Sequence, residues 1–83
     1  MAAAVITGAA GDLGRALTDA FLADGWRVYG GDIVEVVPRA GLVPVPLDVT
    51  DRAGVFALAE RAAAEAGPLR LWINAAGVLR VVA

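Results

Sequence analysis

The stretch VITGAAGDLGR, residues 5–15, joins an apolar run to the start of an amphipathic segment through three glycines. Gly8, Gly11 and Gly14 allow a sharp turn, a close approach of the backbone to a pyrophosphate, and tight packing of a helix against a strand. A helix that begins there directs free N–H groups and partial positive charge toward the phosphates. The stretch predicts a dinucleotide-binding turn, and the alternative interpretation is a turn whose glycines serve packing alone.

Apolar periodicity around this turn predicts alternating strands and helices. Residues 2–7 form the continuous apolar run of a strand buried on both faces of a parallel sheet. Further strands are expected at residues 27–32, 42–48 and 69–73. Helices are expected from about residue 13 to a stop at residue 25, and from just after residue 50 or 51 to about residue 66. The fold class expected is therefore α/β, the N-terminal half of a doubly wound, Rossmann-type parallel sheet with strand order 3-2-1-4.

Local signals refine this outline. Pro44 and Pro46 lack N–H groups on the same side of a strand, so we expect their strand at the edge of the sheet. Residues 33–41 leave room for little more than a loop, where a fuller two-layer fold keeps a helix. Asp12 is expected to cap the first helix, and Thr50 or Asp51 the second.

Composition excludes several classes of function. The 83 residues contain no Cys and no His and carry a net charge of −2 without a basic run, so we expect neither a metal site nor a nucleic-acid partner. No apolar run reaches the roughly 18 residues of a membrane span and no leader precedes the first strand, which favours a cytoplasmic protein without membrane contact. Because 59% of the residues are hydrophobic, we expect apolar surface that a larger fold or a homo-oligomer covers.

Four motifs follow one another in the chain. They are TGAAGDLG at residues 7–14, an aspartate at residue 32 that ends the second strand, DVTD at residues 48–51 and NAAG at residues 74–77. Together they resemble the short-chain dehydrogenases and reductases over the whole chain. The resemblance implies a nicotinamide dinucleotide as cofactor and, in the complete protein, hydride transfer between an alcohol or ketone and the nicotinamide.

The resemblance also implies a cofactor role for residues in each motif. Asp32 would accept hydrogen bonds from the adenosine ribose, and because no basic residue adjoins it, NAD is expected rather than NADP. Asp48 and Val49 would border the adenine, while the backbone at Asn74 passes a ribose and its amide stabilises the sheet. The predicted cofactor-binding residues are Gly8, Gly11, Asp12, Leu13, Gly14, Asp32, Asp48, Val49, Asn74, Ala75, Ala76 and Gly77.

Each of these assignments has a simpler alternative. Asp32 can be a solvated acid at a strand end, and Asp48 can belong to an ordinary helix start. Arg15, just past the turn, can meet a phosphate instead of solvent. Asp12 replaces the middle glycine of the family's commoner pattern, whereas Gly11 matches the spacing of its extended branch.

The catalytic Ser, Tyr and Lys of the family have no counterpart in this chain. It contains no Ser and no Lys, and its single Tyr, Tyr29, lies in the second predicted strand. We therefore expect residues 1–83 to form a partial NAD(P)-binding domain without catalytic residues, which meets a small-molecule substrate only together with the catalytic half that is absent from this chain. The alternative is a stand-alone nucleotide-binding or interaction module, and a third reading is an unrelated domain that binds a flavin or adenosylmethionine.

Overall fold

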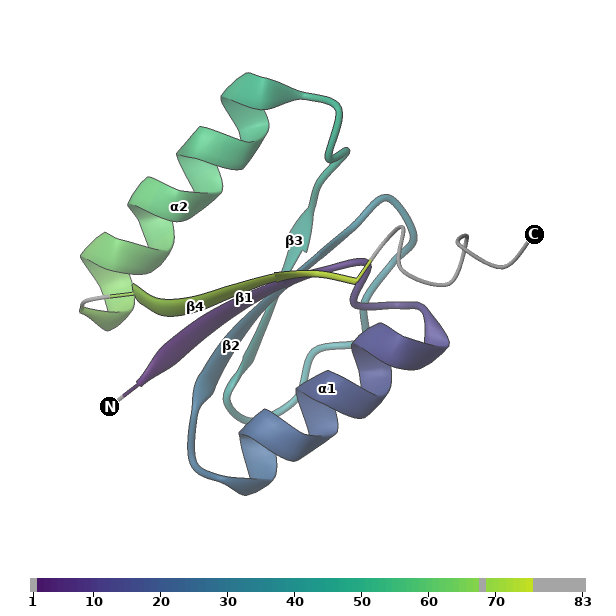
Figure 1. Cartoon of the computed structure of the whole chain (residues 1–83), viewed down its shortest axis with the longest axis vertical. Coiled ribbons are helices and arrows are strands. Elements are labelled where there is room, and N and C mark those ends of the chain that lie inside the picture. Colours follow the sequence, from purple (N-terminus) through teal and green to yellow (C-terminus); the bar gives the residue numbers. More distant parts are fainter. Residues whose placement is uncertain (1, 68, 76–83) are drawn as a thin grey trace.

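Two helices lie on opposite faces of one parallel sheet in the computed structural model, which describes residues 2–67 and 69–75 (Figure 1). The elements follow one another as predicted, within two residues at each end. Their bounds are β1 Ala3–Thr7, α1 Asp12–Ala23, β2 Arg27–Asp32, β3 Leu42–Pro46, α2 Arg52–Ala66 and β4 Leu69–Asn74. The strands lie in the order β3-β2-β1-β4, and every adjacent pair is parallel. This is the N-terminal half of a doubly wound sheet, as the sequence predicts.

β1 lies at the centre and is covered on both faces. All five of its residues are fully buried. Val5 and its register partner Tyr29 on β2 pack with Leu58 against α2, whereas Ile6 and Val28 belong to the core on the α1 side. Because side chains alternate between the faces of a strand, an unbroken apolar run fills both cores.

β3 forms an edge of the sheet, as its prolines predict. The N–H of Leu47 donates to the carbonyl at the end of β2 at 3.1 Å, so alternate residues of β3 direct their N–H groups toward β2. The residues between them face outward. Pro44 and Pro46 have no N–H to offer there, and the N–H of Leu42 donates to the Arg39 carbonyl at 2.9 Å. The outer edge of β3 thus offers carbonyl oxygens without free donors, which disfavours pairing with another strand.

The helix starts confirm one predicted cap and correct another. The Asp51 carboxylate accepts a hydrogen bond from the Gly54 N–H at 3.2 Å and caps α2. The prediction that Asp12 caps α1 is wrong: Gly11 occupies the cap position, no side chain accepts a bond there, and the Asp12 side chain is 94% exposed. The reason is that Asp12 is already the first helical residue, from which a side chain points outward instead of back over the free N–H groups.

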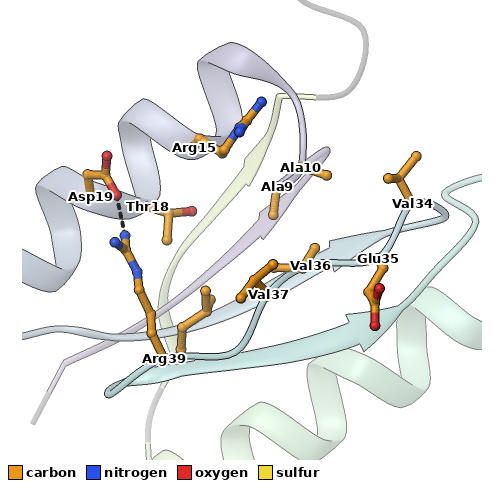
Figure 2. Close-up of a pocket in the computed structure, with 11 residues that line it drawn as sticks. Ala9, Ala10, Arg15, Thr18, Asp19, Val34, Glu35, Val36, Val37 and Arg39 are labelled. Atoms are coloured by element: carbon orange, nitrogen blue, oxygen red, sulfur yellow. Dashed lines mark hydrogen bonds and ion pairs between the residues drawn. The ribbon is translucent and has the colours of Figure 1, made fainter.

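Residues 33–41 form a loop, as expected, and carry no helix. A cavity of about 580 Å³ lies between this loop and α1 (Figure 2). Val36, Val37 and Leu42 contribute apolar side chains to its lining. The Arg39 guanidinium reaches from the loop to the Asp19 carboxylate of α1 and forms an ion pair at its side. The loop therefore contacts α1 through this pair, where a helix would pack in a fuller fold.

Candidate cofactor site

The glycine-rich turn between β1 and α1 is fastened to the end of β2. Gly8 has a φ of 71°, in the left-handed region that a residue without a Cβ adopts readily. The N–H groups of Gly8 and Ala9 both donate to the Gly31 carbonyl, at 2.8 and 3.2 Å, and the Gly11 N–H donates to the Gly8 carbonyl at 3.1 Å. The backbone of the turn is therefore held by its own hydrogen bonds in a defined position at the end of β2.

The first turn of α1 packs directly on this backbone at Gly14. A Cβ at that position would lie 2.0 Å from the Gly8 carbonyl oxygen and 2.8 Å from the Ala9 Cα. Only glycine permits this approach, so the packing role predicted for Gly14 is present. The contact holds the N-terminus of α1 beside the turn, with no side chain capping its N–H groups.

A cavity of about 320 Å³ opens at the carboxyl ends of the strands, next to the turn. Its lining combines the turn, the start of α1 and the segments that follow β2, β3 and β4. The lining residues are Gly8, Gly11, Asp12, Leu13, Gly14, Asp32, Ile33, Leu47, Asp48, Val49 and Ala75. Most of the predicted cofactor-binding residues thus come together in one place, because parallel strands bring their carboxyl ends to the same edge.

Asp32, at the end of β2, is bonded on both oxygens of its carboxylate. Oδ2 accepts the Ala10 N–H at 2.9 Å, and Oδ1 accepts the Val34 N–H at 3.0 Å. The residue is half-buried, so it differs from a freely solvated acid at a strand end. Each carboxylate oxygen has two acceptor positions, so each keeps one that these backbone bonds do not use.

Asp48 and Val49 follow β3 and face the same cavity. Asp48 Oδ1 accepts from the Thr50 hydroxyl at 2.7 Å and from the Thr50 N–H at 2.9 Å. The bond from the Thr50 hydroxyl has the larger effect and the bond from its N–H the smaller one, and together they hold the pKa of the Asp48 carboxyl below its ordinary value. Asp48 is therefore part of the turn that leads into α2 and of the cavity wall at once.

The charged side chains that line the cavity are all acidic. The carboxylates of Asp12, Asp32 and Asp48 line it. The Arg15 guanidinium lies 3.7 Å from the Asp12 carboxylate and offsets part of this charge, although both side chains are largely exposed. A ligand that brings hydroxyl or amino donors is favoured on the Asp32 side, whereas negative charge is favoured only at the uncapped start of α1.

Asn74 lies at the end of β4 and has a structural role. Its Oδ1 accepts hydrogen bonds from the Thr7 hydroxyl and from the Trp72 indole N–H, both at 2.9 Å. The bond from Thr7 joins β1 to β4, whereas the bond from Trp72 lies within β4. Asn74 does not line the cavity. Its neighbour Ala75 is buried and does line it. The last two predicted residues, Ala76 and Gly77, lie outside the described part of the chain.

Two lining residues were missed in the sequence. Ile33 directly follows Asp32 and is 78% exposed despite its large apolar side chain, and Leu47 directly precedes Asp48. Their position beside the two strand-end acids is a signal that the sequence does carry. An apolar residue next to a strand-end acid is nevertheless common, so this signal becomes specific only when the cavity is seen.

Tyr29 lies away from the cavity, on the face of the sheet that α2 covers. Its hydroxyl donates to Glu65 Oε1 at 2.9 Å, and the Arg61 guanidinium stands 5.9 Å from the ring centroid. Burial, followed by the bond to Glu65, raises the pKa of the Tyr29 phenol. This arrangement fastens α2 to the sheet.

Within residues 2–67 and 69–75, no cluster of three or more Asp, Glu, His or Cys side chains is placed to hold a metal ion. The helices of the same part of the chain include none with the length and apolar character needed to cross a membrane.

Comparisons with known proteins agree with the fold. Residues 2–83 match the model of the short chain dehydrogenase family. A doubly substituted variant of a short-chain dehydrogenase/reductase from Serratia marcescens superposes with a TM-score of 0.76 at 21% identity, over 88% of this chain and 34% of the other. A second short-chain dehydrogenase/reductase, from Burkholderia vietnamiensis, gives a TM-score of 0.62 at 26% identity, over 88% and 38%. The chain thus spans little more than a third of the length of these two proteins.

Proposed function

Because the chain belongs to the short-chain dehydrogenase family, we propose that it binds a nicotinamide dinucleotide in the cavity at the carboxyl ends of its strands. The observation that carries this proposal is the convergence of the glycine-rich turn, the uncapped start of α1 and the Asp32 carboxylate on one cavity of about 320 Å³. The backbone N–H groups at the start of α1 suit a pyrophosphate. The two open acceptor positions of Asp32 suit the two hydroxyls of a ribose.

We propose NAD as the preferred dinucleotide. NADP carries a phosphate on the adenosine ribose, which would stand against the Asp32 carboxylate. Two unit charges about 4 Å apart near a protein surface repel by about 4 kcal/mol before screening by salt. Even a third of that energy is worth about tenfold in affinity. The acids at residues 12 and 48, which line the same cavity, add to the repulsion.

In the complete protein, the bound nicotinamide would accept or donate a hydride, and the substrate would be an alcohol or a ketone. This chain would bind and orient the cofactor through its turn and strand ends. It has no Ser and no Lys, and its one Tyr is bonded to Glu65 beneath α2. The proton transfer at the substrate would therefore rest on residues that this chain does not supply.

Titration calorimetry of the chain with NAD and with NADP tests the proposal. We expect NAD to bind at least about tenfold more tightly. Asp32→Ala should reduce the difference in affinity between NAD and NADP, because it removes the carboxylate that repels the extra phosphate of NADP. Glu35→Ala is the matched control, since it removes a nearby negative charge that does not line this cavity. Equal or tighter binding of NADP to the unaltered chain would contradict the proposed preference for NAD.

A further inference from the structure

The Asp32 carboxylate joins two segments that lie far apart in the chain. Through Ala10 it holds the glycine-rich turn, 22 residues away, and through Val34 it holds the loop that follows β2. Figure 2 shows Ala10 at the turn and Val34 at the start of the loop, one across from the other. The Gly8 and Ala9 N–H groups fasten the turn to the Gly31 carbonyl, and the Asp32 side chain adds the bond that links the turn to the start of the loop.

The start of the loop has few other contacts that hold it in place. The side chains of Ile33, Val34 and Val37 are 78%, 61% and 76% exposed, and Val36 alone among the loop's valines packs against the core on the α1 side, so burial contributes little to the position of the loop's start. At its far end Arg39 pairs with Asp19, but both side chains are at least half exposed, which makes this a weak restraint. The start of the loop includes Ile33, which lines the nucleotide cavity. The bond from Val34 to Asp32 thus spans Ile33, which lies in the wall of this cavity.

We propose that Asp32 is a positioning residue: besides meeting the ribose, its carboxylate ties the loop that carries Ile33 to the glycine-rich turn and so sets the nucleotide cavity before the cofactor arrives. For the cofactor this rests on the proposed function, whereas the tie itself is a property of the free protein. A carboxylate suits the task because both of its oxygens accept. An asparagine has one accepting oxygen and can keep only one of the two backbone bonds, and an alanine keeps neither.

Amide hydrogen exchange of the ligand-free chain, followed by NMR, tests the tie without any cofactor. In Asp32→Ala we expect the Ala10 and Val34 amides to exchange about fivefold faster or more, which corresponds to the loss of one typical hydrogen bond each. In Asp32→Asn only one of the two amides should be affected. The Gly8 amide, bonded to the Gly31 carbonyl, reports whether the turn is still folded. Glu35→Ala should leave all three amides unchanged.

Unchanged exchange at both Ala10 and Val34 in Asp32→Ala would overturn the proposal. Equal acceleration at the Gly8 amide in both Asp32 variants would also overturn it, because the whole turn would then have opened and Asp32 would have no specific part in it.

An NAD analogue without the 2′- and 3′-hydroxyls of the adenosine ribose separates positioning from direct contact. If Asp32 acts only on these hydroxyls, Asp32→Ala binds the analogue as tightly as the unaltered chain does, and that outcome would contradict the proposal. We expect a loss of about fivefold for the analogue as well, although the substitution removes a repelling charge. A chain that binds neither NAD nor the analogue would disprove the proposed function, and the exchange of the Ala10 and Val34 amides would still decide whether the tie exists.

Discussion

Replacement of Gly14 by alanine probes the contact on which the site is built. The new Cβ would lie 2.0 Å from the Gly8 carbonyl oxygen, and the other near atoms, 2.8 Å away, are also backbone. Since Cβ contacts shorter than 3.0 Å essentially do not occur, the start of α1 has to move away from the turn by about 1 Å. Overpacking of this kind costs about 1–3 kcal/mol, and backbone atoms cannot rotate away, so we expect the upper end of this range.

The same substitution also has a favourable effect, because alanine is better than glycine inside a helix by about 1 kcal/mol. The net expectation for Gly14→Ala is a free energy of unfolding lower by about 1–2 kcal/mol. For a domain of this size that corresponds to a melting temperature lower by about 5–15 °C. Circular dichroism, recorded during heating and during urea titration, measures both quantities.

Gly54→Ala is the matched control, since Gly54 is the third residue of α2 as Gly14 is of α1. Its new Cβ would lie 2.9 Å from Asp51 Oδ2, the end of a side chain that can rotate away, although rotation weakens its cap bond to the Gly54 N–H. We expect this variant to remain within about 1 kcal/mol of the unaltered chain. A Gly14→Ala variant that melts at or above the melting temperature of the unaltered chain would contradict the close packing of α1 on the turn. In the proposed site, Gly14→Ala should also weaken dinucleotide binding by more than tenfold, because the start of α1 is displaced.

Three further predictions concern ionisation, association and activity. Tyr29 is the only Tyr, so ultraviolet absorbance reports its ionisation alone, and we expect its pKa to lie above the ordinary value of 10.0. It should contribute stability that is present below pH 10.0 and lost as the pH rises through the higher pKa of the folded state. Glu65→Gln should bring the pKa of Tyr29 closer to 10.0, and ionisation of the unaltered chain at or below that value would contradict the effect of burial and of Glu65. In the described residues β4 pairs with β1 alone, and the outer edge of β3 offers no free donors, so we expect the chain to associate through β4. Sedimentation should then show assemblies whose size increases with protein concentration. A folded monomer at every concentration would contradict this. The purified chain should form no NADH with a panel of alcohols, and turnover that copurifies with it would disprove this.

The order of strands and helices and the edge position of β3 could be predicted from the sequence. The reason is that these features depend on local chemistry. Apolar runs and helical spacing distinguish the two kinds of element over a few residues. The missing N–H groups of Pro44 and Pro46 exclude a central strand whatever surrounds them. The three glycines at residues 8, 11 and 14 likewise indicate a close backbone approach before any partner is known.

The details of the candidate site were decided only by the tertiary structure. Whether Asp12 or Gly11 caps α1 depends on a shift of one residue in the start of the helix, and apolar periodicity does not resolve such a shift. The bond from the Ala10 N–H to Asp32 joins residues 22 positions apart, and the bond from Thr7 to Asn74 joins residues 67 positions apart. Such bonds form because the sheet brings the carboxyl ends of β1, β2 and β4 together. Their geometry therefore follows from the packing of the whole sheet and from no segment alone.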